Sequence, residues 1–205
     1  QEQFNFNVSE IEILQKGNLF KGLKKGEIST NDGIVIEADN FEYNKITNIL
    51  KANGSVQVKD TIKNYIIFSD RVIYYKNDEI IVTEGDSKAI DSIGQTIIAN
   101  NFKYNKIKNI LNANGNVKIK NVSKDIEIFS DFITHFRNEK KIITRGKTNS
   151  IIHSKYNIKT RDVLYLEDLE ILSSNFKTII KDDKSNLYNL DNFKYSITQE
   201  ELKGE

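Results

Sequence analysis

The feature that most constrains this chain is an internal duplication. Residues 38–85 align with residues 99–146 without a gap, and about one position in two is identical. Self-similarity at a fixed period is typical of repeat architectures, in which neighbouring units stack and bury one continuous core. The duplication therefore predicts a fold built from repeats.

A finer period of about 30 residues runs through the chain. The recurring pattern is a small residue followed by Asp or Asn, and then an apolar and an aromatic residue separated by one position; Arg161 and Leu190 depart from it in the last two copies. The copies begin at Ala38, Ser69, Ala99, Ser130, Thr160 and Leu190. A glycine follows most of them at a near-constant distance, at Gly54, Gly85, Gly115, Gly146 and Gly204, with Ser174 near the equivalent place in the fifth copy.

Within each copy the apolar residues alternate, as in Ile34, Ile36 and Ala38, and a period of two is typical of β-strands. The alternation slips by one residue at Asp39–Asn40 and again at Asp70–Arg71. Such an extra residue predicts a β-bulge, so each Asp/Asn step is expected to be a corner of the sheet. We predict an all-β fold, an elongated β-jelly roll of two packed, twisted antiparallel sheets built from hairpin repeats.

The pairs Asn53–Gly54 and Asn114–Gly115 have the composition of tight hairpin turns. The repeat argues against turns, because Glu84 and Arg145 replace the Asn in sister copies while the strand pattern continues beyond the glycine. Glycine at this fixed place instead predicts a bulge or a close approach of two backbones, with a sharp bend of the sheet.

We predict that residues 33–205 form the jelly-roll repeat domain. This array is expected to be truncated at its C-terminus, because the sequence ends where the sixth hairpin should begin its return strand. An N-terminal segment, residues 1–32, is interpreted as a degenerate first hairpin with Val8, Ile11, Ile13 and Gly22 in the corresponding positions.

Composition excludes several classes of protein. The 30 Lys and Arg residues nearly balance the 29 Asp and Glu residues, and the signs are mixed along the chain, so nucleic acid is not an expected partner. Disulfides and thiolate metal sites are excluded because cysteine is absent. No apolar run approaches the roughly 20 residues that cross a bilayer. The chain begins at Gln1 without the apolar region of a signal peptide, which indicates a mature or excised fragment.

No group of residues has the spacing of a catalytic, cofactor or metal site. His135 occupies the position that tyrosine fills in other copies, so we interpret it as a wall residue of aromatic size, and His153 has no second ligand at a metal-like spacing. Asp39, Asp70 and Asp131 recur at the bulges and are interpreted as turn residues, not as an acid/base pair. We therefore predict that the chain is not an enzyme and uses no cofactor or metal.

The phrases GIVIEADNFEYNK, LKANGSVQV, ANNFKYNK and LNANGNVKI resemble the OstA family, the LptA-like β-jelly-roll proteins of lipopolysaccharide transport, over residues 33–205. The branch that the chain resembles most is the periplasmic N-terminal domain of the LPS-assembly protein LptD, and a free-standing LptA-like bridge protein is the alternative. The resemblance implies a periplasmic protein that binds lipopolysaccharide and is attached to the outer membrane through a C-terminal barrel outside this chain. It also implies end-to-end β-augmentation with other LptA-like modules and contact with an LptE-like lipoprotein.

The alternation assigns one set of residues to the inward face, and the resemblance implies that this face is a groove for lipid A acyl chains. The groove candidates are Ile36, Phe41, Tyr43, Leu50, Val56, Val58, Ile67, Val72, Tyr74, Ile97, Phe102, Tyr104, Leu111, Val117, Ile119, Ile128 and Ile133. Lys106 is expected to point outward.

Two alternatives come from other classes of protein. A structural β-repeat protein without a ligand would fill its own core, and small inward residues count against it, namely Ala38, Ala52, Ser69, Ala99 and Ala113. A glycan-acting enzyme on a β-helix should bring Asp/Glu pairs together on one exposed face. Neither alternative is favoured by the sequence.

Overall fold

The computed structural model describes residues 4–205, and nearly all of the regular structure there is β-strand. Two short 3-10 turns, η1 (Gln15–Gly17) and η2 (Arg137–Glu139), are the helical segments within this described part of the chain. The sequence-based prediction of an all-β fold of antiparallel strands is confirmed.

The chain divides into two compact units, which are described one at a time. The first consists of the residues up to Ile93 together with Asn101–Ile107, and the second of Gly94–Asn100 together with Lys108–Glu205. The strands of the first unit are β1 (Asn5–Val8), β2 (Ile11–Leu14), β3 (Leu19–Gly22), β4 (Gly26–Ser29), β5 (Ile34–Ala38), β6 (Asn40–Asn44), β7 (Ile49–Asp60), β8 (Tyr65–Tyr75), β9 (Ile80–Glu84), β10 (Ser87–Asp91) and β12 (Asn101–Asn105). Those of the second unit are β11 (Thr96–Ala99), β13 (Ile110–Asn121), β14 (Ile126–Phe136), β15 (Lys141–Ile152), β16 (Tyr156–Arg161), β17 (Leu164–Leu166), β18 (Ile171–Ser174), β19 (Thr178–Asp182), β20 (Leu187–Leu190), β21 (Phe193–Ser196) and β22 (Glu201–Lys203).

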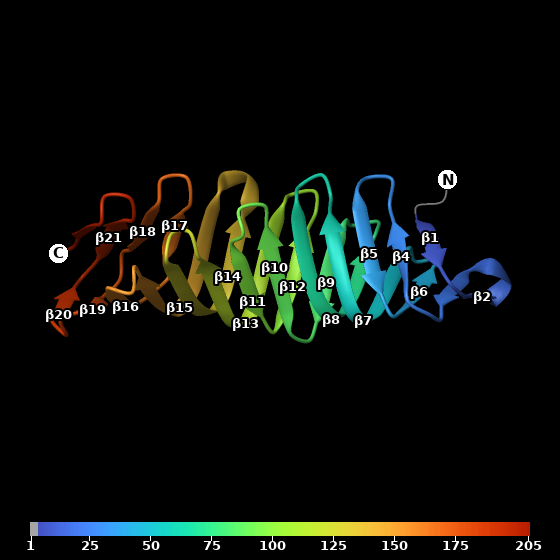
Figure 1. Ribbon diagram of the computed structural model, residues 1–205, viewed down its shortest axis with the longest axis horizontal. Helices are drawn as coiled ribbons and strands as arrows, with labels where there is room; N and C mark the ends of the chain where they lie inside the picture. The colour runs from blue at the N-terminus through green and yellow to red at the C-terminus, as the bar shows by residue number, and fades with distance from the viewer. Residues whose placement is uncertain (1–3) are drawn as a thin grey trace. The chain divides into compact units, whose positions relative to one another are not determined.

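The first unit has two layers that share their longest strands (Figure 1). One layer is formed by β1, β4, β5, the second half of β7, the first half of β8, and β10. The other is formed by β2, β3, β6, the first half of β7, the second half of β8, β9 and β12. We call them layer I and layer II. Because β7 and β8 run through both layers, the chain itself joins the layers along one side.

The second unit repeats this plan. Its layer I contains β11, the second half of β13, the first half of β14, the second half of β15, β16, β19 and β20. Its layer II contains the remaining halves of β13, β14 and β15 with β17, β18, β21 and β22. The repeat of the sequence is therefore a repeat of strand, corner and return strand.

The corners lie at the Asp/Asn steps that the sequence predicts. Pairing between β7 and β8 shifts between Asn53 and Val56, so Gly54 and Ser55 both lie opposite Asp70, which is a β-bulge. Both bulged residues have positive φ, 78° at Gly54 and 45° at Ser55. β7 continues through this site, so the prediction that Asn53–Gly54 is not a hairpin turn is confirmed.

Close approach explains the glycine at the corner. A Cβ atom added to Gly54 would lie 2.9 Å from the Cβ of Asp39, and one added to Gly115 would lie 2.9 Å from the Cγ of Asn100. The Asp39 N–H donates to the Gly54 carbonyl at 3.0 Å, and the Asn100 N–H donates to the Gly115 carbonyl at 2.9 Å. The Asp/Asn and Gly positions of the repeat are thus two halves of one packed corner.

The two layers of each unit pack face to face through aromatic side chains. In the first unit Phe4, which precedes β1 of layer I, lies with its ring centroid 4.9 Å from that of Tyr43 in layer II, in an edge-to-face arrangement. Tyr65 of layer I and Tyr104 of layer II lie 5.5 Å apart. Aromatic pairs at these separations stabilise a core beyond the area that they bury. A single apolar interior therefore runs between the layers of each unit.

The boundary expected at residue 32 stays a prediction. Strands β1 and β4 pair with each other and β4 pairs with β5, so residues 5–29 contribute strands to the same layers as the residues that follow. Residues 1–3 of the expected N-terminal segment lie outside the described residues.

Candidate functional site

The interior between the layers is the candidate binding region, and it is closed in this structure. All seventeen groove candidates are buried, and the most exposed of them, Tyr43, exposes 7% of its surface. The small inward residues do not leave a gap that solvent reaches, because Ala38, Ala52, Ala99 and Ala113 are buried as well. Contact of this face with lipid stays a prediction, and such contact requires the layers to separate.

The tyrosine position of the repeat lies at the edge of this interior, where each ring is buried but its hydroxyl meets polar groups. The hydroxyl of Tyr43 donates to the Asn48 amide oxygen at 3.0 Å, and that of Tyr104 donates to the Asp60 carboxylate at 3.1 Å. Tyr74 donates to Glu79, and burial together with this carboxylate raises the pKa of the Tyr74 hydroxyl. The rings of these tyrosines therefore pack in the apolar interior, while their hydroxyls form hydrogen bonds with the polar residues that border it.

His135 takes the same position in the second unit. The ring is buried in β14, and its Nε2 lies 3.0 Å from the Glu167 carboxylate, which also accepts a hydrogen bond of 2.6 Å from Gln95. Burial alone would raise the pKa of Glu167. The pKa is lowered instead, because His135 contributes a hydrogen bond and a charge and Gln95 contributes a second hydrogen bond. His135 thus fills the aromatic position and adds a polar contact that the sequence did not predict.

His153, the other histidine, lies in the turn after β15, and its Nδ1 is 3.2 Å from the Tyr195 hydroxyl. Burial raises the pKa of Tyr195 to about 12. Among residues 4–205 no three His, Asp or Glu side chains gather in a way that could hold a metal ion.

The polar border of the first unit lies where the turns of the two layers meet, opposite the corners. We call this side the turn margin; it comprises residues 30–33 and 61–64 from layer I and residues 45–48, 76–79 and 106–107 from layer II. Contacts cross it between the layers. Asp32 of layer I forms ion pairs with Lys76 and Lys106 of layer II, and the Lys63 ammonium donates to the Lys106 carbonyl.

A four-residue ion cluster is the centre of the turn margin. The Asp32 carboxylate lies 2.9 Å from the Lys76 Nζ and 2.5 Å from the Lys106 Nζ. Glu79 contacts the Lys76 ammonium and lies 3.5 Å from that of Lys106. The side chains of Lys76, Lys106 and Glu79 are 10%, 12% and 16% exposed, whereas Asp32 is 43% exposed. The outward orientation expected for Lys106 is therefore wrong.

Electrostatics favour the charged forms of Asp32 and Lys76. Burial alone would raise the pKa of the Asp32 carboxyl, but hydrogen bonds from Lys106 and Lys76 hold that pKa well below its ordinary value of 3.8. Burial alone would lower the pKa of Lys76, and the carboxylates of Glu79 and Asp32 raise it instead. Both signs of charge are thus present together at the edge of an apolar interior.

Exposed aliphatic side chains border the turn margin of the first unit. Ile46 and Ile107 occupy turns of layer II, Ile62 occupies a turn of layer I, and Ile93 follows β10 of layer I. Their exposed fractions lie between 66% and 73%. Single exposed apolar residues are ordinary, but their recurrence at turns of both layers gives this side apolar side chains as well as charged ones.

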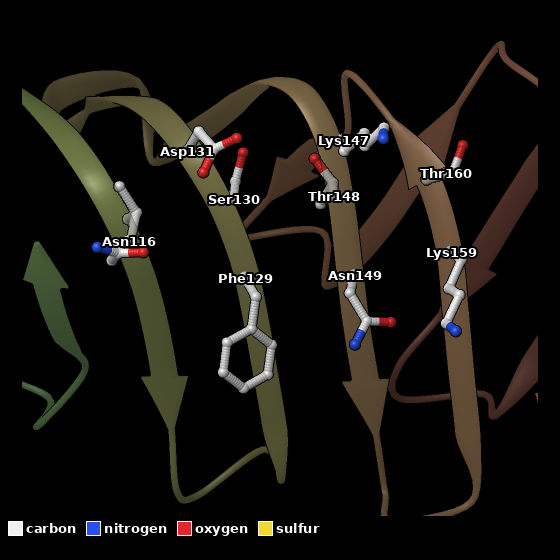
Figure 2. Close-up of a pocket in the computed structure, with 10 residues that line it drawn as sticks. Asn116, Phe129, Ser130, Asp131, Lys147, Thr148, Asn149, Lys159 and Thr160 are labelled. Carbon is white, nitrogen blue, oxygen red and sulfur yellow. The ribbon is translucent and has the colours of Figure 1, made fainter.

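A separate surface pocket of about 520 Å³ lies on the outer side of the second unit (Figure 2). Phe129, Asn149 and Lys159 project from neighbouring strands there, and Asp131 and Lys147 lie at its corner end. A Cβ atom at Gly146 would meet nothing within 4 Å, so this corner is less filled than those at Gly54 and Gly115. The exposed position of Asp131 at a corner agrees with a turn residue.

Comparison with known proteins supplies a structural likeness without a sequence match. Neither the protein-family models nor the curated protein sequences contain a match to the chain. The crystal structure of LptH from Pseudomonas aeruginosa, described as the LptA homologous periplasmic component of the lipopolysaccharide transport device, is similar with a TM-score of 0.50 and 12% sequence identity. The match covers 54% of this chain and 81% of that chain. This likeness establishes an LptA-like jelly-roll fold.

A second solved structure, a mutant of the TCP10 domain of CPAP from Danio rerio, has a TM-score of 0.19 and 9% identity over 88% of this chain and 97% of that one. A score of this size carries no argument. Within residues 4–205, no helix is both long and apolar enough to span a membrane.

Proposed function

We propose that this chain is a jelly-roll module of periplasmic lipopolysaccharide transport, and that its interior shelters the acyl chains of the lipid. The observation that carries the proposal is the likeness of the fold to LptH, a transport component, over most of that protein. The continuous apolar interior of each unit is consistent with such a role, because acyl chains need an environment without water.

The free energy gained when acyl chains are sheltered from water is large. Removal of an acyl chain from water stabilises it by roughly 0.8 kcal/mol for each buried methylene, so a lipid with several chains stays bound to protein or membrane throughout transit. A transport module therefore needs a continuous apolar surface more than it needs a reactive group. The buried faces of β7, β8 and β12 have this character.

The way in which the interior opens follows from the connectivity. Strands β7 and β8 join the layers covalently at the corners, whereas the turn margin is held by side-chain contacts such as those of Asp32. Separation of the layers at the turn margin breaks these polar contacts and parts the packed side chains of the interior, but it leaves every strand intact. We infer that lipid enters from this side.

The finer form of the proposal is an N-terminal domain of an LptD-like assembly protein that adjoins an LptA-like module. In support, the match with LptH covers most of that chain but only 54% of this one, so the repeat array here is the longer. Within the described residues β20 pairs with β19 alone and β22 with β21 alone, which leaves edges for a neighbouring module to extend.

Photo-crosslinking in Gram-negative cells that transport lipopolysaccharide tests the proposal. A photoreactive residue at Phe102, which is buried in β12, is expected to label lipopolysaccharide, and so is one at Leu111 of the second unit. The matched control is Lys103, the exposed neighbour of Phe102 on the same strand, which is expected to remain unlabelled. Lys106 is unsuitable as an outward control, because its side chain lies in the turn margin.

Two results would contradict the proposal. Equal labelling from Phe102 and Lys103 would exclude an interior path for the acyl chains. No adduct at any position, with the protein folded and exported, would favour a structural β-repeat protein that fills its own core.

A further inference from the structure

Basic residues recur at one position of the repeat, two residues after the aromatic position. Lys45 follows Tyr43, Lys76 follows Tyr74 and Lys106 follows Tyr104, and Arg137 follows His135 in the second unit. Residues two apart on a strand share a face, so each of these side chains starts from the inward side at the end of its strand. Four copies of the repeat thus place a basic residue two positions after the aromatic one, whereas Glu167 and Ile197 take this position after Tyr165 and Tyr195.

In the first unit two of these lysines converge on one carboxylate. The Nζ atoms of Lys76 and Lys106 lie 2.9 Å and 2.5 Å from the same oxygen of Asp32, Oδ2. Asp32 comes from the turn between β4 and β5 in layer I, whereas both lysines come from turns of layer II. An anionic oxygen therefore already lies between two nearly buried ammonium groups, and the group that supplies it is part of the opposite layer.

We propose that Lys76 and Lys106 form a binding site for a phosphate group of an acylated lipid, and that Asp32 occupies this site while the protein is free of lipid. The inference rests on the proposed function, which it deepens by naming the headgroup chemistry. Lipid binding would replace one anion with another, so the two ammonium groups remain paired throughout.

Asp32 is the member of the cluster best able to leave. It is the most exposed of the four, and it precedes Gly33, whose φ of +92° belongs to a tight turn. Departure of its carboxylate would leave two lysines against Glu79 alone, a local net charge of +1 that favours an anion. Because Asp32 links the two layers, its displacement also removes a contact that holds the turn margin closed.

The surroundings fit an amphiphile with a phosphorylated headgroup. Exposed Ile62 and Ile107 lie on opposite sides of the turn margin, next to Lys63 and Lys106, whose side chain and carbonyl are in contact across it. Behind the lysines are the buried rings of Tyr74 and Tyr104 and then the apolar interior. A phosphate at the lysines would leave the attached acyl chains directed between the layers.

The test compares two lipids and three variants of the full chain by equilibrium binding. The probes are a bisphosphorylated hexa-acyl lipid A and the same lipid without its phosphates. Lys106→Gln is expected to weaken binding of the phosphorylated lipid about tenfold, the size of one lost charge-assisted hydrogen bond, and not to weaken binding of the dephosphorylated lipid. Asp32→Asn is expected to tighten binding of the phosphorylated lipid, a gain that a misfolded variant could not produce.

The matched control is Lys51→Gln, which removes an exposed lysine that pairs with Glu42 at 3.5 Å on the outer face, and neither affinity should change. Equal affinity of the unmodified protein for both lipids would overturn the phosphate site and leave the transport proposal intact. Binding of inorganic phosphate as tight as that of the phosphorylated lipid would assign the lysines to free phosphate instead. Failure to bind either lipid would overturn the transport proposal itself.

Discussion

Replacement of Phe102 with alanine is expected to lower the free energy of unfolding by about 3–5 kcal/mol. The ring is fully buried between the layers, so its loss removes apolar contacts and leaves a cavity that β12 cannot fill. The strand is held by its pairing with β9 and by a hydrogen bond of 2.7 Å from the Phe102 N–H to the Thr83 hydroxyl. Urea unfolding of the purified, lipid-free protein measures this loss.

The stability of Phe102→Ala also shows whether the interior is packed or open in the lipid-free protein. Lys103→Ala, on the exposed side of the same strand, should change the free energy of unfolding by less than about 0.5 kcal/mol. If Phe102→Ala cost as little as this control, the ring would not be packed in the absence of lipid. The interior would then be an open groove in the free protein, in conflict with the closed interior described above.

The replacement of Lys76 with methionine is expected to destabilise the first unit by about 3 kcal/mol. Methionine keeps most of the apolar stem but removes the ammonium that contacts Asp32 and Glu79. The nearly buried carboxylate of Glu79 would lose the closer of its two ion pairs. The Lys106 ammonium, 3.5 Å away, would be the cation that remains beside it. Denaturant unfolding followed by a probe in the first unit measures the effect.

A double variant separates the charge effect from loss of packing. Lys76→Met combined with Glu79→Gln should recover most of the stability, because the amide needs no cation and can still accept the hydrogen bond from Tyr74. Lys51→Met, at an exposed ion pair, should cost less than about 1 kcal/mol. A double variant no more stable than Lys76→Met alone would show that the unpaired charge of Glu79 is not the cause of the loss.

Much of the fold could be predicted from the sequence because each signal was local. The slips of alternation at Asp39 and Asp70, together with a glycine at a fixed distance, predicted corners, and the bulge at Gly54 confirms them. Strict alternation also assigned Phe102 and Leu111 to the buried face. A period of two leaves little freedom once one face of a strand must avoid water.

The contacts between polar groups at the turn margin could not be predicted from the sequence, because they join turns from different layers. Asp32 and Lys106 are far apart in the chain, and nothing in either turn indicates that the two meet. One signal was available: the alternation that assigns Tyr104 inward extends to Lys106 two residues later. Because lysine side chains are most often exposed, we expected Lys106 to point outward in spite of this alternation.

The histidine position shows the same limit. Size and periodicity were sufficient to predict that His135 replaces a tyrosine in the core. Its partner Glu167 occupies the repeat position that holds Lys76 and Lys106 in the first unit, and Gln95 comes from a turn of the opposite layer. Such a pairing depends on how the layers meet, which a periodic pattern does not specify.

Lipopolysaccharide is expected to separate the layers at the turn margin, where its acyl chains enter the interior. The chain has no cysteine, so spin labels on cysteines introduced at Ile62 and Ile107 would report the distance between layers of the first unit specifically. A pair at Ile62 and Ile93, both from layer I, is the control. On addition of lipopolysaccharide we expect the distance between layers to lengthen while the control distance stays constant. Bound lipopolysaccharide with both distances unchanged would exclude entry of the acyl chains through the turn margin.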